Sequence, residues 1–280
     1  MAVKIVTDSG ADVPLEVTEK LGIVVVPLTF SFGADSFKDG VDMSSEQFYD
    51  RLVVEEALPT TSQPSVGDFA EVYKTLKSSG DEILSIHISA KLSGTLNSAT
   101  QAGALENLAD SIQYIDSQQA SMGLGFSVIA AAEAAQNGAS LTEAASAARS
   151  VLDRTRTYIL FDTLKYLEKG GRIGKANALL GSVFQIKPIL TLQDGEIATK
   201  VKVRTLHKGI ESLEQLTEEC GDLESAAILY TTDQTRATDL AGRLRNSFAS
   251  GAKPIINRIS PAVGAHGGPG VIGVVCVAAN

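Results

Sequence analysis

The sequence predicts an α/β protein with two domains. Over the first part of the chain, short β-branched runs alternate with helical patterns, which is typical of a mostly parallel sheet flanked by helices. Further on, Asp194-Gly195 separates two apolar runs and predicts an antiparallel hairpin. The length of 280 residues also exceeds the usual size of one domain, about 100–200 residues. We therefore expect an N-terminal α/β domain over 1–160 and a second α/β domain with a mixed or antiparallel sheet over 161–280. One large domain stays open as the alternative.

In the first half, glycines and capping patterns mark where helices begin and end. The helix after Ser65 carries apolar residues at i, i+3, i+4 and i+7 from Phe69, which gives it one apolar stripe, and Gly80 ends it. Ser140 and Glu143 form a capping-box pattern at the start of another helix. The expected elements are strand Lys4–Thr7, helix Pro14–Lys20, strand Val24–Phe30, helix Ser65–Gly80, strand Glu82–Ile88, helix Thr95–Leu108, strand Ile112–Ile115, helix Ser121–Gln136, the helix from Ser140, and strand Tyr158–Phe161.

In the second half, the hairpin introduces antiparallel pairing. Runs of alternating or consecutive apolar residues predict the remaining strands, and helical patterns lie between these runs. The expected elements are strands Ile186–Gln193 and Glu196–Val203, helix Leu206–Cys220, strand Ala226–Thr231, helix Gln234–Phe248, and strands Ile255–Ile259 and Val271–Val277.

The composition predicts a globular protein that repels anionic partners. Hydrophobic residues make up 44% of the chain and charged residues 20%, which is enough apolar material for a core. The net charge is −9 and the pI is near 4.9, so nucleic acid and anionic membranes repel the protein on average. We therefore expect no nucleic-acid partner.

The termini and the two cysteines indicate a reducing, intracellular location. Cys220 and Cys276 are far apart in sequence and have no zinc-like spacing, so neither a disulfide framework nor a metal site is predicted. The stretch Met1–Asp8 resembles a first strand and lacks the features of a signal peptide. The longest apolar run, Val271–Ala279, is much shorter than the roughly 20 residues that span a bilayer. We expect a cytoplasmic protein without stable membrane insertion.

Common enzyme motifs are missing from the sequence. The stretch Gly170–Ala176 resembles a phosphate-binding loop, but Lys169 and Ala176 break its rule. There is no metalloprotease, EF-hand or nucleophile-elbow motif. Of the three histidines, His87 lies in an apolar strand and is expected in the core, whereas His207 opens a helix and is expected in solvent. His266 stands among four glycines, which favours a functional role.

Three polar segments, each expected to be a loop, contain the candidate site residues. They are Pro59–Ser65, Ser89–Thr95 and Gly264–Gly270. The second lies between the end of a strand and the start of a helix, where open α/β sheets bind ligands and where free N–H groups suit an anion. Taken alone, Ser93 fits a helix N-cap better than a ligand contact, and the first segment fits a turn before a capped helix better than a binding loop.

Motifs along the whole chain, in the same order, make it resemble the DegV family of bacterial fatty-acid-binding proteins. They are Val6-Thr7-Asp8-Ser9, Pro27-Leu28-Thr29, Thr61-Ser62-Gln63-Pro64-Ser65, Leu92-Ser93-Gly94-Thr95, Asp162-Thr163-Leu164-Lys165-Tyr166-Leu167, Gly170-Gly171-Arg172-Ile173-Gly174-Lys175 and Gly264-Ala265-His266.

The resemblance implies a lipid-binding protein that is not itself an enzyme. It implies one long-chain fatty acid, such as palmitate or oleate, in a buried tunnel to which the second domain contributes. The carboxylate would be held by Thr61 and Ser93, with Ser62, Gly94 and His266 beside them. No cofactor, metal or catalytic residue is implied; the partner would be a separate ATP-dependent fatty acid kinase that converts the acid to an acyl phosphate.

Two further interpretations and one surface remain open at this stage. A serine hydrolase or acyl transferase could use Ser93 and His266, although no nucleophile elbow or orienting acid is evident. A small-molecule phosphotransferase would match a resemblance of fold to the dihydroxyacetone kinases, but no phosphate loop supports it. Arg172, in a loop with Lys165, Lys169 and Lys175, is either an ordinary solvated residue or part of a basic face that meets the kinase.

Overall fold

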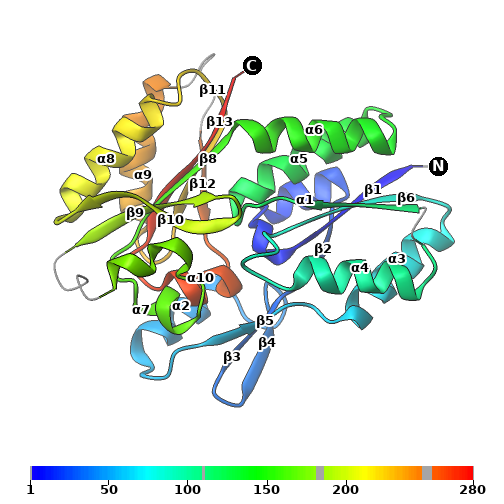
Figure 1. Ribbon diagram of the computed structural model, residues 1–280, viewed down its shortest axis with the longest axis horizontal. Coiled ribbons are helices and arrows are strands. Elements are labelled where there is room, and N and C mark those ends of the chain that lie inside the picture. Colours follow the sequence, from blue (N-terminus) through cyan, green and yellow to red (C-terminus); the bar gives the residue numbers. More distant parts are fainter. Residues whose placement is uncertain (1, 109–110, 181–185, 248–253, 280) are drawn as a thin grey trace.

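Two large β-sheets and one small sheet form the framework of the protein. The computed structural model describes residues 2–108, 111–180, 186–247 and 254–279. The four-stranded and six-stranded sheets lie on opposite sides of a helix pair, α5 (Met122–Gln136) and α6 (Leu141–Arg154), and the small three-stranded sheet projects at the bottom of the view (Figure 1). The predicted α/β class, with one parallel and one mixed sheet, is confirmed.

The four-stranded sheet is fully parallel, in the order β2-β1-β6-β7. Successive side chains along its strands point to opposite faces of the sheet, and both faces are apolar and buried. Val6 and Ile83 point to the face covered by α3 and α4, whereas Ile5 and Leu84 point to the face covered by α5 and α6. The elements are β1 (Val3–Asp8), α1 (Leu15–Leu21), β2 (Val24–Val26), α3 (Val66–Ser78), β6 (Glu82–His87), α4 (Thr95–Leu105) and β7 (Ile112–Asp116).

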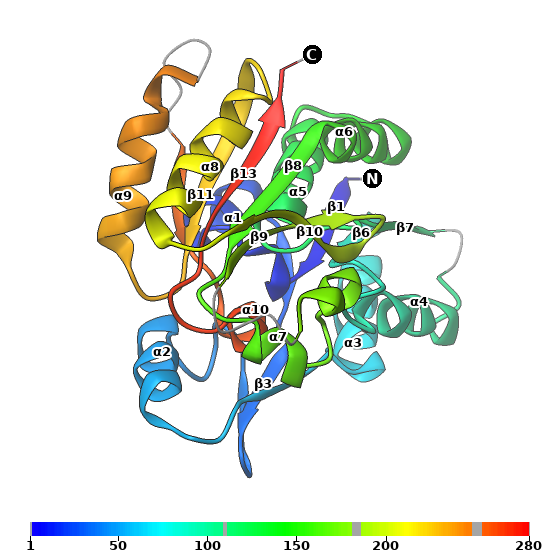
Figure 2. The same cartoon turned by 60° about the vertical axis from the view of Figure 1, so that its left-hand side comes forward.

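The six-stranded sheet is mixed, in the order β10-β9-β8-β13-β11-β12, with β11 and β12 as its parallel pair. The turned view in Figure 2 shows α8 and α9 over its outer face. The predicted hairpin is confirmed: Asp194 and Gly195 have φ values of 53° and 79° between β9 and β10. The elements are β8 (Thr155–Leu160), β9 (Lys187–Gln193), β10 (Glu196–Val203), α8 (Leu206–Glu218), β11 (Leu223–Tyr230), α9 (Gln234–Arg243), β12 (Ile255–Arg258) and β13 (Ile272–Ala278).

The prediction of one strand over Val24–Phe30 is wrong. The run is divided at Pro27, which has no N–H to donate to a sheet. Its first part is β2, and its second part is β3 (Thr29–Phe32), the central strand of the small antiparallel sheet between β4 (Asp35–Lys38) and β5 (Thr60–Ser62). The break therefore carries the chain from one sheet to another.

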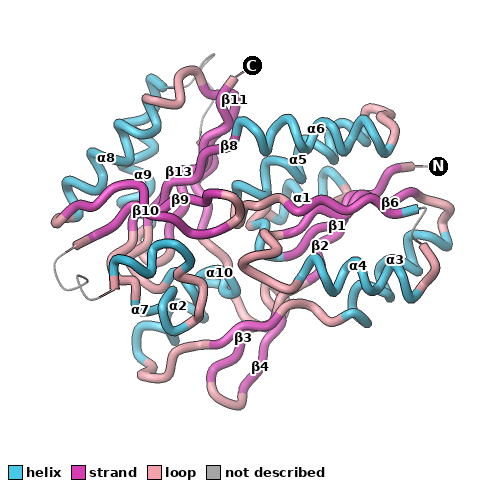
Figure 3. The backbone as a smooth tube through the Cα atoms, in the orientation of Figure 1, coloured by secondary structure: helices cyan, strands magenta, loops and turns pink. Residues whose placement is uncertain are grey.

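Several short elements were not predicted. Besides β4 and β5, they are α2 (Ser45–Val54), α7 (Lys165–Lys169), α10 (Pro261–Gly267) and the 3₁₀ turns η1 (Ser9–Ala11), η3 (Gly174–Leu179) and η5 (Leu244–Ser247). Because β5 covers Thr60–Ser62, the prediction of a loop over Pro59–Ser65 is wrong for these three residues. Figure 3 shows α10 beside α7 and α2, close to the small sheet, and α10 contacts all three.

Phe248, the expected end of a helix, lies outside the described residues. The boundary near 160 stays a prediction, although β8 already pairs within the six-stranded sheet.

No helix in the described part of the chain has both the length and the apolar composition needed to cross a bilayer.

Candidate functional site

A cavity lies where the four-stranded and six-stranded sheets approach each other. It encloses about 1000 Å³, counted together with its opening to solvent, and both halves of the chain line it. Most of the lining side chains are apolar, among them Ile159, Phe161, Leu190, Leu192, Ile197 and Leu229. Concave sites of this size and composition are typical of small-molecule binding.

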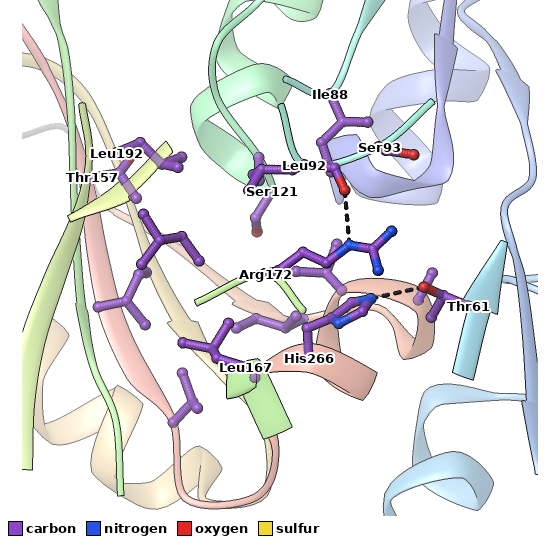
Figure 4. Close-up of a pocket in the computed structure, with 18 of the residues that line it drawn as sticks. Thr61, Ile88, Leu92, Ser93, Ser121, Thr157, Leu167, Arg172, Leu192 and His266 are labelled. Atoms are coloured by element: carbon purple, nitrogen blue, oxygen red, sulfur yellow. Dashed lines mark hydrogen bonds between the residues drawn. The ribbon is translucent and has the colours of Figure 1, made fainter. Parts of the chain in front are cut away.

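Four of the polar lining side chains gather at one end of the cavity, whereas Thr157 lies beside Leu192 at the other. In Figure 4, Thr61, Ser93, Arg172 and His266 lie on one side, and Leu192 lies on the other. Thr61 comes from β5 of the small sheet, and its Oγ1 shares a hydrogen bond of 2.7 Å with Nε2 of His266. Residues 205 positions apart in sequence therefore meet at this end.

The loop that carries Ser93 is held by the hairpin of the six-stranded sheet and by Arg172, which lies between α7 and η3. Ser89 Oγ donates to the carbonyl of Gly195, at the tip of the hairpin, over 2.7 Å. Arg172 Nε donates to the carbonyl of Leu92 over 3.1 Å (Figure 4). The position of Ser93 therefore depends on contacts across the cavity.

Gly94, not Ser93, occupies the N-cap position of α4, and no side chain caps that helix. Ser93 Oγ instead shares a hydrogen bond of 2.8 Å with Thr95 Oγ1. A Cβ at Gly94 would lie 2.9 Å from Nε2 of Gln63, so glycine lets the 60–65 segment approach the start of α4. Gly94 thus brings the two predicted motifs together through its lack of a side chain.

His266 lies in a helix, so the prediction of a loop over Gly264–Gly270 is wrong for its first four residues. Pro261 begins α10 with a backbone angle suited to a first turn, and Gly268, with φ of 76°, ends it. The glycines in between hide this short helix from a sequence analysis. Gly264 is required by packing, because a Cβ there would lie 2.1 Å from the hydroxyl of Tyr49.

The His266 imidazole is neutral at pH 7. Burial, and then the nearby charge of Arg172, lower its pKa to about 4. Its Nδ1 is buried without a hydrogen-bond partner and faces Gly170, where a Cβ would lie 2.2 Å from that nitrogen. Because Nε2 meets Thr61, the ring can hold the Thr61 hydroxyl without adding a charge to the site.

Arg172 is half-buried and lines the same cavity. Besides its bond to Leu92, its Nη1 donates to the carbonyl of Gly170 over 2.7 Å. Lys165, Lys169 and Lys175 on the neighbouring segment are exposed, and Lys175 pairs with Asp194. Arg172 thus lines the cavity and belongs to a chain segment with three exposed lysines.

The contacts do not assemble a hydrolase site around Ser93. The hydroxyl of Ser93 pairs with Thr95, and the imidazole of His266 pairs with Thr61. An Asp–His–Ser chain does occur: His87 Nδ1 bonds to Asp8 over 2.8 Å and its Nε2 to Ser85 over 2.7 Å. All three are fully buried and none lines the cavity, so this chain is structural, and the prediction of a core His87 is confirmed.

A buried carboxyl lies behind the cavity wall. Asp12 Oδ1 accepts the Ser260 N–H over 3.1 Å, and its Oδ2 accepts the hydroxyl of Ser121, which lines the cavity. Burial raises the pKa of Asp12 to about 7, although the hydrogen bonds from Ser121 and Ser260 lower it. The nearby charge of Asp39 raises the pKa further. Asp12 therefore connects η1 to the residue just before α10.

Of the predicted site residues, Thr61, Ser62, Ser93 and His266 line this one cavity, and Gly94 lies directly beside it. Arg172, predicted only as a partner-binding residue, also lines it. Ser121 and Thr157 were not predicted, since a single hydroxyl in an apolar segment carries no distinguishing pattern. Within the described residues, no cluster of three or more metal-ligating side chains occurs.

Comparisons with known proteins agree with one another. The model of the DegV family, described as uncharacterised proteins, matches residues 2–279. A DegV domain-containing protein of Clostridium acetobutylicum is 39% identical, over 98% of this chain and 97% of that protein.

Solved structures match over almost the full length. A DegV family protein from Thermus thermophilus, described by its fatty acid binding, has a TM-score of 0.92 at 30% identity, with both chains covered completely. A stearic acid-binding protein from Eubacterium ventriosum has a TM-score of 0.89 at 27% identity, covering 99% of this chain and 98% of that one.

Proposed function

The chain belongs to the DegV family, and on this basis we propose that it binds one long-chain fatty acid in the cavity between its two large sheets. The observation that carries the proposal is an apolar cavity with neutral hydroxyl and imidazole groups at one end. The tail would lie against the six-stranded sheet, and the carboxylate would lie near Thr61, Ser62 and Ser93. The fatty-acid-binding relatives support this assignment.

The acyl tail supplies most of the affinity in this proposal. Burial gains about 0.8 kcal/mol per methylene, so a tail of roughly 16 carbons contributes over 10 kcal/mol before the cost of association. An apolar cavity is the environment in which that gain is realised.

The polar end mainly offsets the cost of burying a carboxylate. A buried carboxylate without hydrogen bonds costs several kcal/mol, and hydroxyl donors cancel that penalty and fix the orientation. Ser93 Oγ and Thr61 Oγ1 have neutral partners, so each can turn its proton towards a ligand oxygen. Arg172 adds a positive charge close by, as its effect on His266 indicates.

We further propose that the protein presents this carboxylate in the cytoplasm to a separate ATP-dependent kinase, which forms the acyl phosphate. The missing phosphate-loop pattern supports a division of labour in which the partner binds ATP. The exposed lysines next to Arg172 offer a basic surface at the polar end of the cavity. Arg172 is the residue we assign to the contact with the partner or the new phosphate.

Removing the Ser93 hydroxyl is expected to weaken fatty-acid binding without abolishing it. A buried acceptor left without one partner costs about 1–3 kcal/mol, so the Kd of Ser93→Ala should rise roughly 5- to 150-fold. Calorimetry with the parent, Ser93→Ala and the exposed control Ser146→Ala measures this effect. Ester hydrolysis by the parent that Ser93→Ala abolishes would establish the hydrolase interpretation instead.

Replacing Arg172 is expected to separate binding from phosphorylation. Because the tail dominates affinity, Arg172→Ala should retain one equivalent of fatty acid. Acyl-phosphate formation with a purified kinase should slow at least tenfold, which is about the effect of losing one charged hydrogen bond in the transition state. A variant with Lys165, Lys169 and Lys175 changed to alanine tests the exposed basic surface separately. An unchanged phosphorylation rate of Arg172→Ala at low salt would refute the assignment.

A further inference from the structure

The hairpin of β9 and β10 extends beyond the six-stranded sheet as a two-stranded ribbon over residues 191–198. β9 pairs with β8 at Ile189 and Leu190. Over the ribbon the two hairpin strands pair with each other, and no other strand of the described part of the chain pairs with them there. Figure 2 shows the hairpin running from the six-stranded sheet towards β6. A two-stranded hairpin alone is marginally stable in water, so the position of the ribbon depends on what it packs against.

The tip of the ribbon docks on Ser89, in the first half of the chain. Gly195 is buried although it lies at the tip of a hairpin, and its carbonyl accepts the Ser89 hydroxyl over 2.7 Å. A Cβ at Gly195 would lie 2.6 Å from Ser89 Oγ and 3.5 Å from the Cβ of Gln118, so glycine is required for this close approach. Ser89 is itself fully buried. The docked tip therefore depends on a buried hydrogen bond.

Ser89 also holds the loop that carries Ser93. Its carbonyl accepts the N–H of Leu92 over 2.9 Å and the N–H of Ser93 over 3.0 Å. Its Oγ accepts the N–H of Lys91 over 3.3 Å. One buried residue thus connects the hairpin tip to the backbone of Ser93, which lines the cavity.

The strands of the same ribbon form part of the apolar wall of the cavity. Thr191, Leu192 and Ile197 all line it, and Leu192 lies opposite Ser93 in Figure 4. On the backbone side η3 supports the ribbon, where a Cβ at Gly174 would lie 2.7 Å from the Ile197 carbonyl. An acyl tail that reaches Leu192 and Ile197 supports the ribbon from within the cavity, and a shorter tail leaves that side without packing.

We infer that Ser89 is a positioning residue that couples the two ends of the lipid site. A tail packed against the ribbon favours the docked tip, and the docked tip fixes the Ser93 loop for the carboxylate. This inference rests on the proposed function. A long tail shifts the ribbon towards its docked arrangement because it binds that arrangement better. Coupling between sites is reciprocal, so the carboxylate is held more tightly beside a long tail than beside a short one.

A series of ligands tests the coupling in the unsubstituted protein. Competition against radiolabelled palmitate gives the Kd of palmitate, hexadecanol, laurate and dodecanol. Each alcohol keeps the tail of its acid and lacks the carboxylate, so the ratio of the alcohol Kd to the acid Kd reports the head-group contacts. We expect this ratio to be at least about fivefold larger for the long pair than for the short pair, which is the lower end of typical coupling between sites.

Two results of this series would overturn the inference, and they are distinguishable. Equal ratios for the two pairs would show that the tail does not affect the head-group contacts, and would leave the proposed function standing. Binding of neither acid would contradict the proposed function, and this inference with it.

Two variants disrupt the contact of Ser89 with Gly195 from its two sides. Ser89→Ala removes the hydroxyl, and Gly195→Ala places a methyl group against it. In both, the head-group ratio should become the same for the two tails. The matched control is Lys91→Ala, which removes an exposed ion pair between the same loop and Glu196 and should keep the ratios of the parent.

Circular dichroism shows whether each variant is folded, and the ligand series in the parent does not depend on that result. A head-group ratio that still depends on the tail in a folded Ser89→Ala or Gly195→Ala variant would overturn the role assigned to Ser89.

Discussion

An Ile197→Trp variant is expected to lose most of its affinity for long-chain fatty acids. Ile197 lies on the edge strand β10, pairs with Leu192, and lines the apolar part of the cavity. An indole there occupies space needed by the acyl tail. Displacing about four methylenes costs about 3 kcal/mol, which raises the Kd roughly 150-fold. Calorimetry with palmitate and oleate measures this change.

The matched control is Lys202→Trp, which places the same side chain on the same strand at an exposed position outside the cavity. It should bind like the parent. The substitution should also weaken the binding of a shorter fatty acid less than that of a long one, because a shorter tail does not reach the space that the indole fills. Parent-like affinity for long chains in Ile197→Trp would place the tail elsewhere.

Asp12→Asn is expected to make the protein more stable at pH 8. The folded-state pKa of Asp12, about 7, lies above the ordinary value of 3.8. The folded state therefore holds the proton more tightly than the unfolded state does. The stability that this neutral carboxyl contributes is fully present below pH 3.8 and is lost as the pH rises through 7. The loss is roughly 1.4 kcal/mol per pH unit within that window. Asparagine resembles the neutral carboxyl and tolerates the φ of 52° at this position.

The measurement is denaturant unfolding of the parent and Asp12→Asn between pH 4.5 and 8. The variant's advantage should be small at pH 4.5 and grow to a few kcal/mol at pH 8. Asp39, whose pKa burial raises to about 6, is present in both proteins. A variant that is less stable than the parent by the same amount at every pH would show that the ionised carboxylate is the required form.

The sequence predicts the elements whose pattern is local. The capping box predicted at Ser140, the helix predicted after Ser65 and the turn predicted at Asp194 are all present. Errors occur where a long-range contact decides the structure. Thr29–Phe32 leaves the parallel sheet because β4 and β5 pair with it, and α10 forms where Gly264 packs against Tyr49. Neither contact has a local pattern in the sequence.

For the site, the sequence predicted the residue types but not their arrangement. Thr61, Ser93 and His266 were selected by motif and do line one cavity. The pairing of Thr61 with His266 and the contact of Arg172 with Leu92 depend on how the sheets pack, so they could not be predicted. The low pKa of His266 has the same origin, because burial is its main cause.

The central claim is that the cavity holds a fatty acid. The protein should be purified from a bacterial host without added lipid, denatured in organic solvent, and the extract quantified by mass spectrometry. We expect about one equivalent of long-chain fatty acid per chain, since a tail gain of over 10 kcal/mol predicts retention through purification. An extract without fatty acid, together with no uptake of added palmitate or oleate, would contradict the claim.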